Sequence, residues 1–253
     1  MTAVEPTPTI LLDDVHYTVD GRYVLGGVNL TIRPAELVAI VGGSGSGKTT
    51  LLRLIMGLIR PTGGRLLVRG VDITGLRENE LNEIRKTVGL VFQYSALFDF
   101  LSVAENVAFG LRQHRRLEEA AIQAAVAEKL ALVGMEGTEQ MRPAELSGGM
   151  RKRVGIARAL ALEPDIMLYD EPTSGLDPPL AAAVDDLIVQ LRDRLGVTSV
   201  VVSHDVATVL RTADRMAMLH QGRIIEEGPP RQLAERGGPV VRQFLGRRGQ
   251  APG

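Results

Sequence analysis

The most informative segment of the sequence is Gly42-Gly43-Ser44-Gly45-Ser46-Gly47-Lys48-Thr49. It matches the phosphate-binding P-loop pattern and lies between an apolar run at 37–41 and a helical run at 50–58, as that motif requires. Glycines let successive backbone N–H groups turn towards phosphate oxygens, and the following helix adds partial positive charge. We expect Lys48 to reach the β and γ phosphates of a nucleotide, Thr49 to offer its hydroxyl to Mg²⁺, and Thr50 to belong to the same site. A Gly/Ser-rich loop without function would not need Lys-Thr in this register.

A pair of carboxylates follows a second apolar run, residues 166–169. Ligands of α/β sheets bind at the carboxyl ends of the strands, where these side chains would lie. Acidic residues at strand ends are commonly solvated, but this chain also carries a P-loop. We therefore predict that Asp170 holds Mg²⁺ and that Glu171 polarises the attacking water. His204 follows the next apolar run and is expected to donate a hydrogen bond to the γ-phosphate or to that water.

The composition is that of an ordinary globular chain with material for a sizeable core: 253 residues, 45% hydrophobic and 23% charged. Lys plus Arg number 29 against 30 for Asp plus Glu, so the basic excess that duplex nucleic acid demands is missing. We expect no nucleic-acid partner. Cysteine is absent, which excludes disulfides and fits a reducing compartment. No run of about 18 apolar residues occurs, so we expect no membrane span and no secretion signal.

The order of the elements predicts an α/β fold with a parallel sheet covered by helices. Residues 37–41, 166–169 and 197–202 are apolar throughout and are expected to be central strands buried on both faces. Residues 10–19 and 23–32 flank Asp20-Gly21, which predicts a hairpin in a smaller antiparallel sheet at the front. The strand pattern disappears between about 102 and 162, and residues 118–133 are Ala-rich with helical spacing. We expect one domain over 10–245, with an inserted helical lobe at about 95–162 and flexible ends at 1–9 and 246–253.

One further motif separates this chain from other P-loop proteins, Leu146-Ser147-Gly148-Gly149-Met150, just before a helix running through Arg158. Together with Gln93, the Asp170-Glu171 pair, His204 and Ser174-Gly175-Leu176-Asp177, it resembles the ABC ATPase family from about residue 10 to residue 233.

The resemblance implies a RecA-like P-loop NTPase core that hydrolyses ATP with Mg²⁺. It also implies a homodimer of two chains facing head to tail. Ser147, Gly148 and Gly149 of one chain would then close over the nucleotide held by Lys48 of the other, with Asp177 nearby. Gln93 would act both as a ligand of Mg²⁺ and in catalysis.

The residues themselves fit this reading. Ser147 is suited to cap a helix whose free N–H groups bind anions, and Arg151 and Lys152 would add positive charge. Taken alone, the run Arg151-Lys152-Arg153 would more often be a solvated helix face.

Met150 stands where Gln or Glu is usual in that signature. With the segments 94–99, 105–107 and 243–245, it makes the chain similar to the Mla/Mce-type lipid-transport ATPases. This resemblance implies phospholipid or other lipid transport across the bacterial envelope. The partners would be an integral membrane permease and an MCE-type lipid-binding component, with the ATPase peripheral on the cytoplasmic side of the inner membrane. The alternatives are the ATPase of a small-solute importer and a soluble ABC protein without a transport role.

Three further features of the sequence allow more than one interpretation. The family places an aromatic residue for the adenine just before the hairpin, whereas this chain has Val19 there, with Tyr17 and Tyr23 nearby. Phe98 and Phe100 are equally compatible with the core and with a groove for a permease helix. At the C-terminus, an apolar stripe at helical spacing needs a partner. We favour a contact across the dimer over packing on its own chain, and the stripe comprises Val240, Val241, Phe244 and Leu245.

Overall fold

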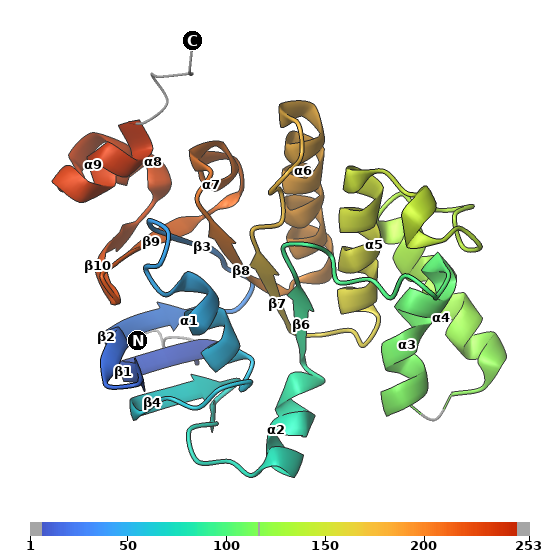
Figure 1. Cartoon of the computed structure of the whole chain (residues 1–253), viewed down its shortest axis with the longest axis horizontal. Coiled ribbons are helices and arrows are strands. Elements are labelled where there is room, and N and C mark those ends of the chain that lie inside the picture. Colours follow the sequence, from blue (N-terminus) through green and yellow to red (C-terminus); the bar gives the residue numbers. More distant parts are fainter. Residues whose placement is uncertain (1–6, 116, 247–253) are drawn as a thin grey trace, which may run out of the picture.

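A six-stranded sheet runs through the centre of the molecule (Figure 1), in the order β10-β9-β3-β8-β7-β6. The computed structural model describes residues 7–115 and 117–246, so most of the flexible ends predicted above lie outside the described residues. Strands β9, β3, β8, β7 and β6 are parallel, and β10 is antiparallel to β9. The strands are β3 (Leu37–Val41), β6 (Val88–Val91), β7 (Ile166–Asp170), β8 (Thr198–Ser203), β9 (Arg215–His220) and β10 (Arg223–Gly228).

A smaller antiparallel sheet with the order β2-β1-β4-β5 packs beside the central one. The predicted hairpin is confirmed, since Val19 pairs with Arg22 across Asp20 and Gly21. Both turn residues have positive φ, 48° and 73°, as the tight turn requires. The strands are β1 (Ile10–Val19), β2 (Arg22–Ile32), β4 (Gly63–Val68) and β5 (Val71–Asp72).

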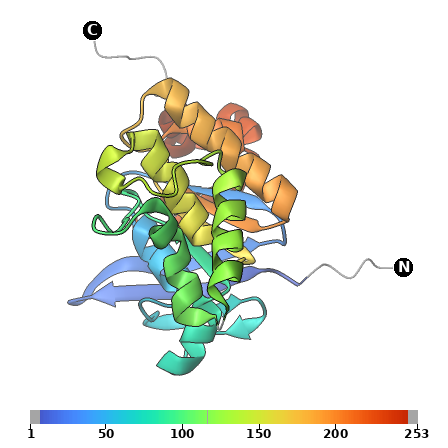
Figure 2. The same ribbon diagram turned by 90° about the vertical axis from the view of Figure 1, so that its right-hand side faces the viewer.

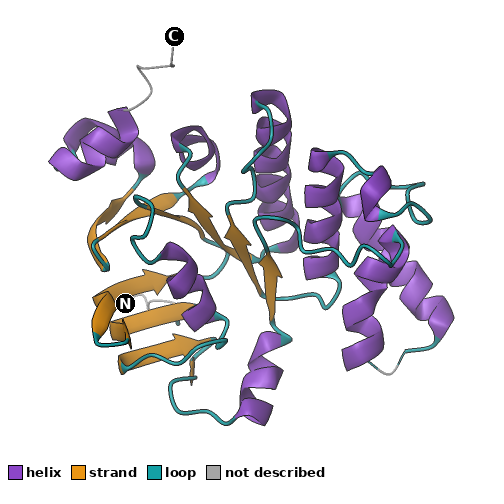
Figure 3. Cartoon of the chain, in the orientation of Figure 1, coloured by secondary structure: helices purple, strands orange, loops and turns teal. Residues whose placement is uncertain are grey.

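Helices cover the sheets and gather most densely on one side (Figures 1 and 3). In the view of Figure 2, several of them lie in front of the strands. Three of them, α3, α4 and α5, lie where the sequence predicts a helical lobe. The helices are α1 (Lys48–Ile55), α2 (Glu78–Arg85), α3 (Val103–His114), α4 (Glu119–Leu132), α5 (Gly148–Leu160), α6 (Pro178–Leu195), α7 (Val206–Thr212), α8 (Pro230–Arg236) and α9 (Pro239–Gly246), with a short 3₁₀ turn at Pro143–Glu145.

The central strands are buried on both faces, as their unbroken apolar sequence predicts. In β3, Val38 and Ile40 point into a core shared with the front sheet and helix α1. Ala39 and Val41 point the other way, into a cluster with α7 and α9. Within the described residues, no helix combines the length and the apolar character needed to cross a membrane.

The favoured prediction for the C-terminal stripe, a contact across the dimer, is wrong for Val241 and Leu245. Helix α9 folds back on its own chain, where both side chains are buried against β3, β9 and α7. The physical reason is that the open face of β3 and β9 offers an apolar surface within reach of the chain's own tail. Val240 and Phe244 are only partly buried in the same cluster.

A buried carboxyl group joins helices α6 and α7, which follow strands β7 and β8. Asp185 of α6 is 2% exposed, and its Oδ2 lies 3.7 Å from Nε of Arg211 on α7. Its Oδ1 has no hydrogen-bond partner among the described residues. Burial raises the pKa of Asp185 to about 7; the Thr208 hydroxyl and Arg211 oppose this rise, and the charges of Asp205 and Asp186 add to it.

We predict that Asp185→Asn stabilises the protein at pH 8. A folded-state pKa near 7, against 3.8 ordinarily, means that the neutral carboxyl stabilises the fold below pH 3.8 and that this contribution is lost as the pH rises from 3.8 through 7. Asparagine keeps the neutral shape at every pH, so the free energy of unfolding should exceed wild type by roughly 2 to 4 kcal/mol at pH 8. Urea melts at pH 5 and pH 8 measure this, and the difference at pH 5 should be less than half of that at pH 8. The exposed neighbour Asp186→Asn is the matched control, and equal effects of the two substitutions at pH 8 would contradict the prediction.

Candidate functional site

A cavity of about 1130 Å³ opens at the carboxyl ends of β3, β7 and β8. Parallel strands bring their carboxyl ends to one edge, so three predicted motifs that are far apart in sequence meet there. The cavity is lined by the whole P-loop with Thr50, by Gln93 just after β6, by the two carboxylates and by the histidine. The predicted residues that line it are Gly42, Gly43, Ser44, Gly45, Ser46, Gly47, Lys48, Thr49, Thr50, Gln93, Asp170, Glu171 and His204.

The P-loop is wedged tightly between strands. A Cβ at Gly42 would lie 2.2 Å from the carbonyl oxygen of Leu219, and one at Gly47 would lie 2.8 Å from Leu25 Cδ2. Gly47 also has φ 105°, in the region that favours glycine. The Ser46 hydroxyl is buried and has no partner in the described part of the chain. The loop therefore forms a narrow cradle of backbone with a polar atom free to bind a ligand.

The side chain of Lys48 binds back to the backbone of the P-loop in this structure. Its Nζ donates to the carbonyl oxygens of Gly42 (2.9 Å) and Gly43 (3.0 Å). Burial lowers its pKa, and the nearby carboxylates of Glu171 and Asp170 oppose the change. The ammonium thus sits in the mouth of the cradle, where a phosphate could exchange for the two carbonyls.

The residues expected to hold Mg²⁺ form a small oxygen-rich group. The Thr49 hydroxyl donates to Oδ1 of Asp170 at 3.3 Å. Burial raises the pKa of Asp170, and the bond from Thr49 opposes this rise. The described residues contain no cluster of three His, Cys, Asp or Glu side chains that could bind a metal alone. This donor set suits Mg²⁺, which takes one or two protein oxygens and completes its shell with phosphate and water.

Hydrogen bonds hold Glu171 both by its carboxylate and by its backbone. Nδ1 of His204 lies 2.6 Å from its Oε2, and its backbone N–H donates to the carbonyl of Val202 at 3.0 Å. Its own carbonyl accepts from the N–H of Ser174 at 3.1 Å. Its φ of 50° is in the left-handed region, which costs a non-glycine residue about 1 to 3 kcal/mol and is common at active sites. The carboxylate is therefore held by its neighbours in one orientation.

Four predicted residues do not reach this cavity: Ser147, Gly148, Gly149 and Asp177. Ser147 caps α5, as predicted, accepting from Met150 N–H at 3.3 Å. Asp177 caps α6 in the same way, accepting from Leu180 N–H at 3.0 Å. A Cβ at Gly148 would lie 3.2 Å from Leu176. Within one chain, then, the signature and the P-loop form separate surfaces.

Sequence reasoning missed several residues around the cavity. Lys152 is expected to add positive charge at the start of α5, but it is 5% exposed and its Nζ points towards the carbonyls of Gln93 and Glu171; the alternative of a solvated face does not describe it either. The local sequence carries no signal for this burial, since Arg151 and Arg153 on either side bear the same charge. Among the other lining residues, Ser174, Gly175 and Leu176 belong to the motif quoted above and Phe244 to the C-terminal stripe. Val24, Thr173, Asp205 and Val206 were not singled out from the sequence.

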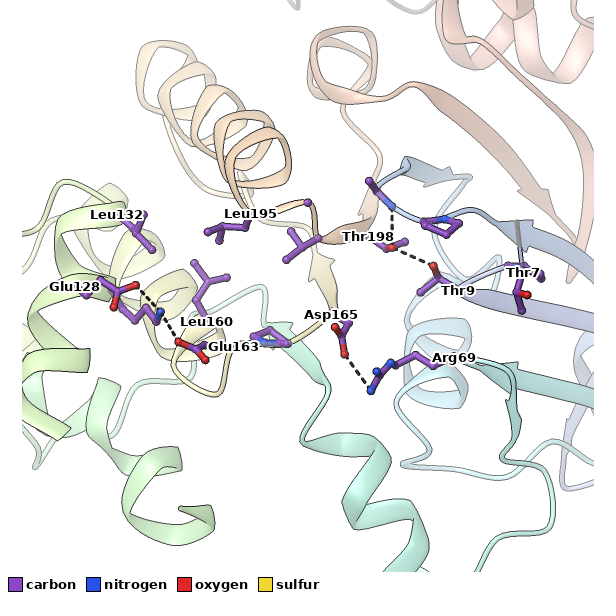
Figure 4. A pocket seen from close by; sticks show the side chains of 17 residues that line it. Thr7, Thr9, Arg69, Glu128, Leu132, Leu160, Glu163, Asp165, Leu195 and Thr198 are labelled. Atoms are coloured by element: carbon purple, nitrogen blue, oxygen red, sulfur yellow. Dashed lines mark hydrogen bonds and ion pairs between the residues drawn. The ribbon is translucent and has the colours of Figure 1, made fainter. Parts of the chain in front are cut away.

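A second cavity, of about 620 Å³, lies near the start of β8 and contains none of the predicted site residues (Figure 4). Its charged groups are already paired. Arg69 bonds Asp165 at 3.0 Å, and Lys129 bonds Glu163 at 3.2 Å. The Thr198 hydroxyl donates to the Thr9 hydroxyl at 3.2 Å. The free polar atom, the cradle and the carboxylates all belong to the first cavity, which is the candidate site.

Comparison with known proteins agrees with this geometry. The model of the ABC transporter family matches residues 25–174. The chain is 43% identical over 232 residues to the intermembrane phospholipid transport system ATP-binding protein MlaF of Escherichia coli K12, covering 92% of this chain and 86% of that protein. It is 45% identical over 232 residues to the methionine import ATP-binding protein MetN of Xanthomonas campestris, covering 90% and 69%.

Solved structures extend the likeness to three dimensions. The dimeric ATP-binding cassette MJ0796, in a post-hydrolysis state bound to ADP and Pi, matches with a TM-score of 0.79 and 34% identity over 87% of this chain and 98% of that one. The cbiO1 protein of Clostridium perfringens, part of the ABC transporter complex cbiONQ, matches with a TM-score of 0.83 and 30% identity over 94% and 98%. The P-loop NTPase fold with its antiparallel front sheet is confirmed, and the chain is an ATP hydrolase that uses ATP and Mg²⁺. It belongs to the ABC transporter family, as an ATP-binding subunit that pairs with a second ATPase subunit and with a membrane permease.

Proposed function

We propose that this chain hydrolyses MgATP at a head-to-tail homodimer interface to power lipid transport, with phospholipid as the cargo, across a bacterial envelope through a separate permease. The observation that carries the dimeric site is the separation of Ser147 to Gly149 from the cavity that holds Lys48. The N-terminus of a helix, with backbone N–H groups that have no partner within the helix, is an anion site. It becomes part of the nucleotide site when a second chain presents it.

In this proposal each cavity residue has a role set by its contacts. Gly42 to Thr50 would cradle the phosphates, Thr49, Gln93 and Asp170 would hold Mg²⁺, and the ion would neutralise charge on the β and γ phosphate oxygens. Glu171 would take a proton from the attacking water. His204, 2.6 Å from Glu171, would hold that carboxylate and donate towards the phosphate. Asp177 would stand at the dimer interface.

An aromatic surface supports the permease partner. Phe98 packs against Phe109 with ring centroids 4.7 Å apart and against Phe100 at 5.8 Å. Phe100 is 73% exposed and Phe109 is 41% exposed. Of the two interpretations weighed for this segment, Phe100 therefore belongs to the surface, while Phe98 forms its partly buried base. Clustered exposed aromatic residues are typical of protein contacts, and a short cytoplasmic helix of the permease would fit here.

Lipid as the cargo rests on similarity. MlaF carries phospholipid transport in its name, and the signature Met150 and the segments 94–99, 105–107 and 243–245 are the features by which this chain resembles the Mla/Mce-type ATPases. The same resemblance supports an MCE-type lipid-binding component in the complex and a peripheral position on the cytoplasmic side of the inner membrane. The likeness to MetN, a methionine import protein, keeps a small-solute importer as the second candidate.

The adenine site is the least conventional part of the proposal. Val19 is 43% exposed and does not line the cavity, whereas Val24 does. Tyr23 is 78% exposed, and Tyr17 packs partly into the core. None of the three residues considered for stacking lines the nucleotide cavity in this structure. The base would therefore be held without an aromatic plate from its own chain.

We predict that GTP replaces ATP with a comparable rate of hydrolysis. A missing base-aromatic stack removes about 1 to 3 kcal/mol of binding, so contacts to the base should contribute little to any difference between ATP and GTP. Steady-state turnover with each nucleotide, over a range of concentrations, measures the preference. A preference for ATP above about a hundredfold in the wild type, nearly 3 kcal/mol, would mean that an aromatic residue stacks after all.

We predict that Glu171→Gln abolishes ATP turnover and leaves ATP binding intact, because the amide cannot accept the proton of the attacking water. The test uses the chain purified with its permease and reconstituted in liposomes containing a fluorescent phospholipid. Hydrolysis, ATP binding and phospholipid movement are followed together. Wild type should move phospholipid only with MgATP, and Glu171→Gln should move none.

Lys48→Ala is the comparison variant, since it should lose nucleotide affinity rather than turnover of bound nucleotide. Hydrolysis by Glu171→Gln within a few-fold of wild type would place the base elsewhere. Stimulation of wild-type hydrolysis by a small solute, without movement of phospholipid, would favour the importer instead.

A further inference from the structure

A buried lysine connects the signature helix to the catalytic loop. Lys152 of α5 is 5% exposed, and its Nζ donates to the carbonyl of Gln93 and lies 3.5 Å from the carbonyl of Glu171. Burial lowers its pKa, while the Glu171 carboxylate opposes this. Removing an ammonium group from water is costly unless its interactions are replaced. Here those interactions come from the backbone of two proposed site residues.

These contacts complete a ring. Nε2 of Gln93 donates to the Ser174 hydroxyl at 3.2 Å, and the Ser174 N–H donates to the Glu171 carbonyl at 3.1 Å. Lys152 closes the ring, because its Nζ contacts the carbonyl oxygens of both Glu171 and Gln93. The ring thus fixes the end of β6 relative to the end of β7. Its one charged side chain, Lys152, comes from α5.

The same helix holds the adjoining loop further along. Nη1 of Arg158 donates to the Ala96 carbonyl at 2.6 Å, and Nη2 donates to the Ser95 carbonyl at 2.9 Å. Its guanidinium carbon lies 6.0 Å from the centre of the Phe98 ring. Ser95 and Ala96 have φ of 60° and 46°, an unfavourable conformation that such contacts maintain. The loop from Gln93 to the aromatic surface is thus attached to α5 at both ends.

We propose that Lys152 is a positioning residue that ties the backbone of Glu171 to that of Gln93, so that the orientation of the catalytic carboxylate depends on where α5 lies. The inference rests on the proposed roles of Glu171 and Gln93. A shift of α5 against the sheet, produced at the aromatic surface or by the partner subunit at Ser147, would reach Glu171 through a single side chain. The buried ammonium makes this link strong, because a charged donor bonds carbonyls more tightly than a neutral one.

The chain contains a matched control. Lys129 of α4 is also 5% exposed, but its Nζ is paired with the carboxylates of Glu128 (2.8 Å) and Glu163 (3.2 Å). It lines the second cavity rather than the nucleotide cavity. Replacing either lysine by methionine removes a buried ammonium of similar exposure. Only the Lys152 replacement removes a contact to the catalytic loop.

The experiment compares full-length Lys152→Met, Lys129→Met and Lys152→Arg with wild type. It measures kcat, KM for ATP, ATP binding and the melting temperature. For Lys152→Met we expect kcat to fall by about tenfold or more while ATP binding stays within about threefold, the pattern of an interaction that matters after substrate is bound. Lys129→Met should keep the kcat of wild type at temperatures where it is folded. Lys152→Arg keeps the charge and the donors and should recover most of the lost kcat.

A kcat for Lys152→Met equal to that of Lys129→Met would overturn the inference. So would a loss of kcat that Lys152→Arg does not recover, since the charge would then not be the cause. If Lys152→Met does not fold, Lys152→Gln, whose amide can serve one carbonyl, takes its place with the same criteria. Failure of the proposed function is seen separately, as continued hydrolysis by Glu171→Gln, and does not depend on any Lys152 variant.

Discussion

The contact between the P-loop and strand β9 constrains the rest of the site. With the would-be Cβ of Gly42 only 2.2 Å from the carbonyl of Leu219, no side chain can enter between the loop and the sheet. The backbone path of the loop from the end of β3 to the start of α1 is therefore restricted to one direction. Because β3 is the neighbour of both β8 and β9, this direction also fixes where His204 and the carboxylates of β7 stand relative to Lys48.

Those features that follow from local sequence could be predicted. The P-loop, the carboxylates after β7 and the hairpin at Asp20-Gly21 all rest on short motifs whose backbone requirements are strict. Unbroken apolar runs identified β3, β7 and β8, since only a strand covered on both faces tolerates them. The Ser147 cap likewise follows from its position before a helical pattern.

Features that depend on packing between distant segments could not be predicted. Nothing around Lys152 or Asp185 distinguishes them from the exposed charges beside them, and only the approach of α5 to the sheet and of α6 to α7 buries them. The C-terminal helix α9 likewise packs against segments that are distant in the sequence. Its stripe predicts that a partner exists, but the apolar face of β3 and β9 that receives Val241 and Leu245 is assembled from segments about 30 and 200 residues away. The signature residues Ser147 to Gly149 show a related effect, since no packing within one chain brings them to the cavity that holds Lys48.

Helix α1 lies between the two sheets, and its Leu51, Leu52, Leu54 and Ile55 share one core with strands of both. The helix that starts at the P-loop is therefore also the main apolar connection between the front and the central sheet. A ligand that binds only the folded protein stabilises every part that must be folded for binding. A nucleotide bound at the first turn of α1 should therefore stabilise both sheets. The two sheets are for this reason expected to behave as a single cooperative unit, whose amide protons exchange together and whose protection increases together when nucleotide is present.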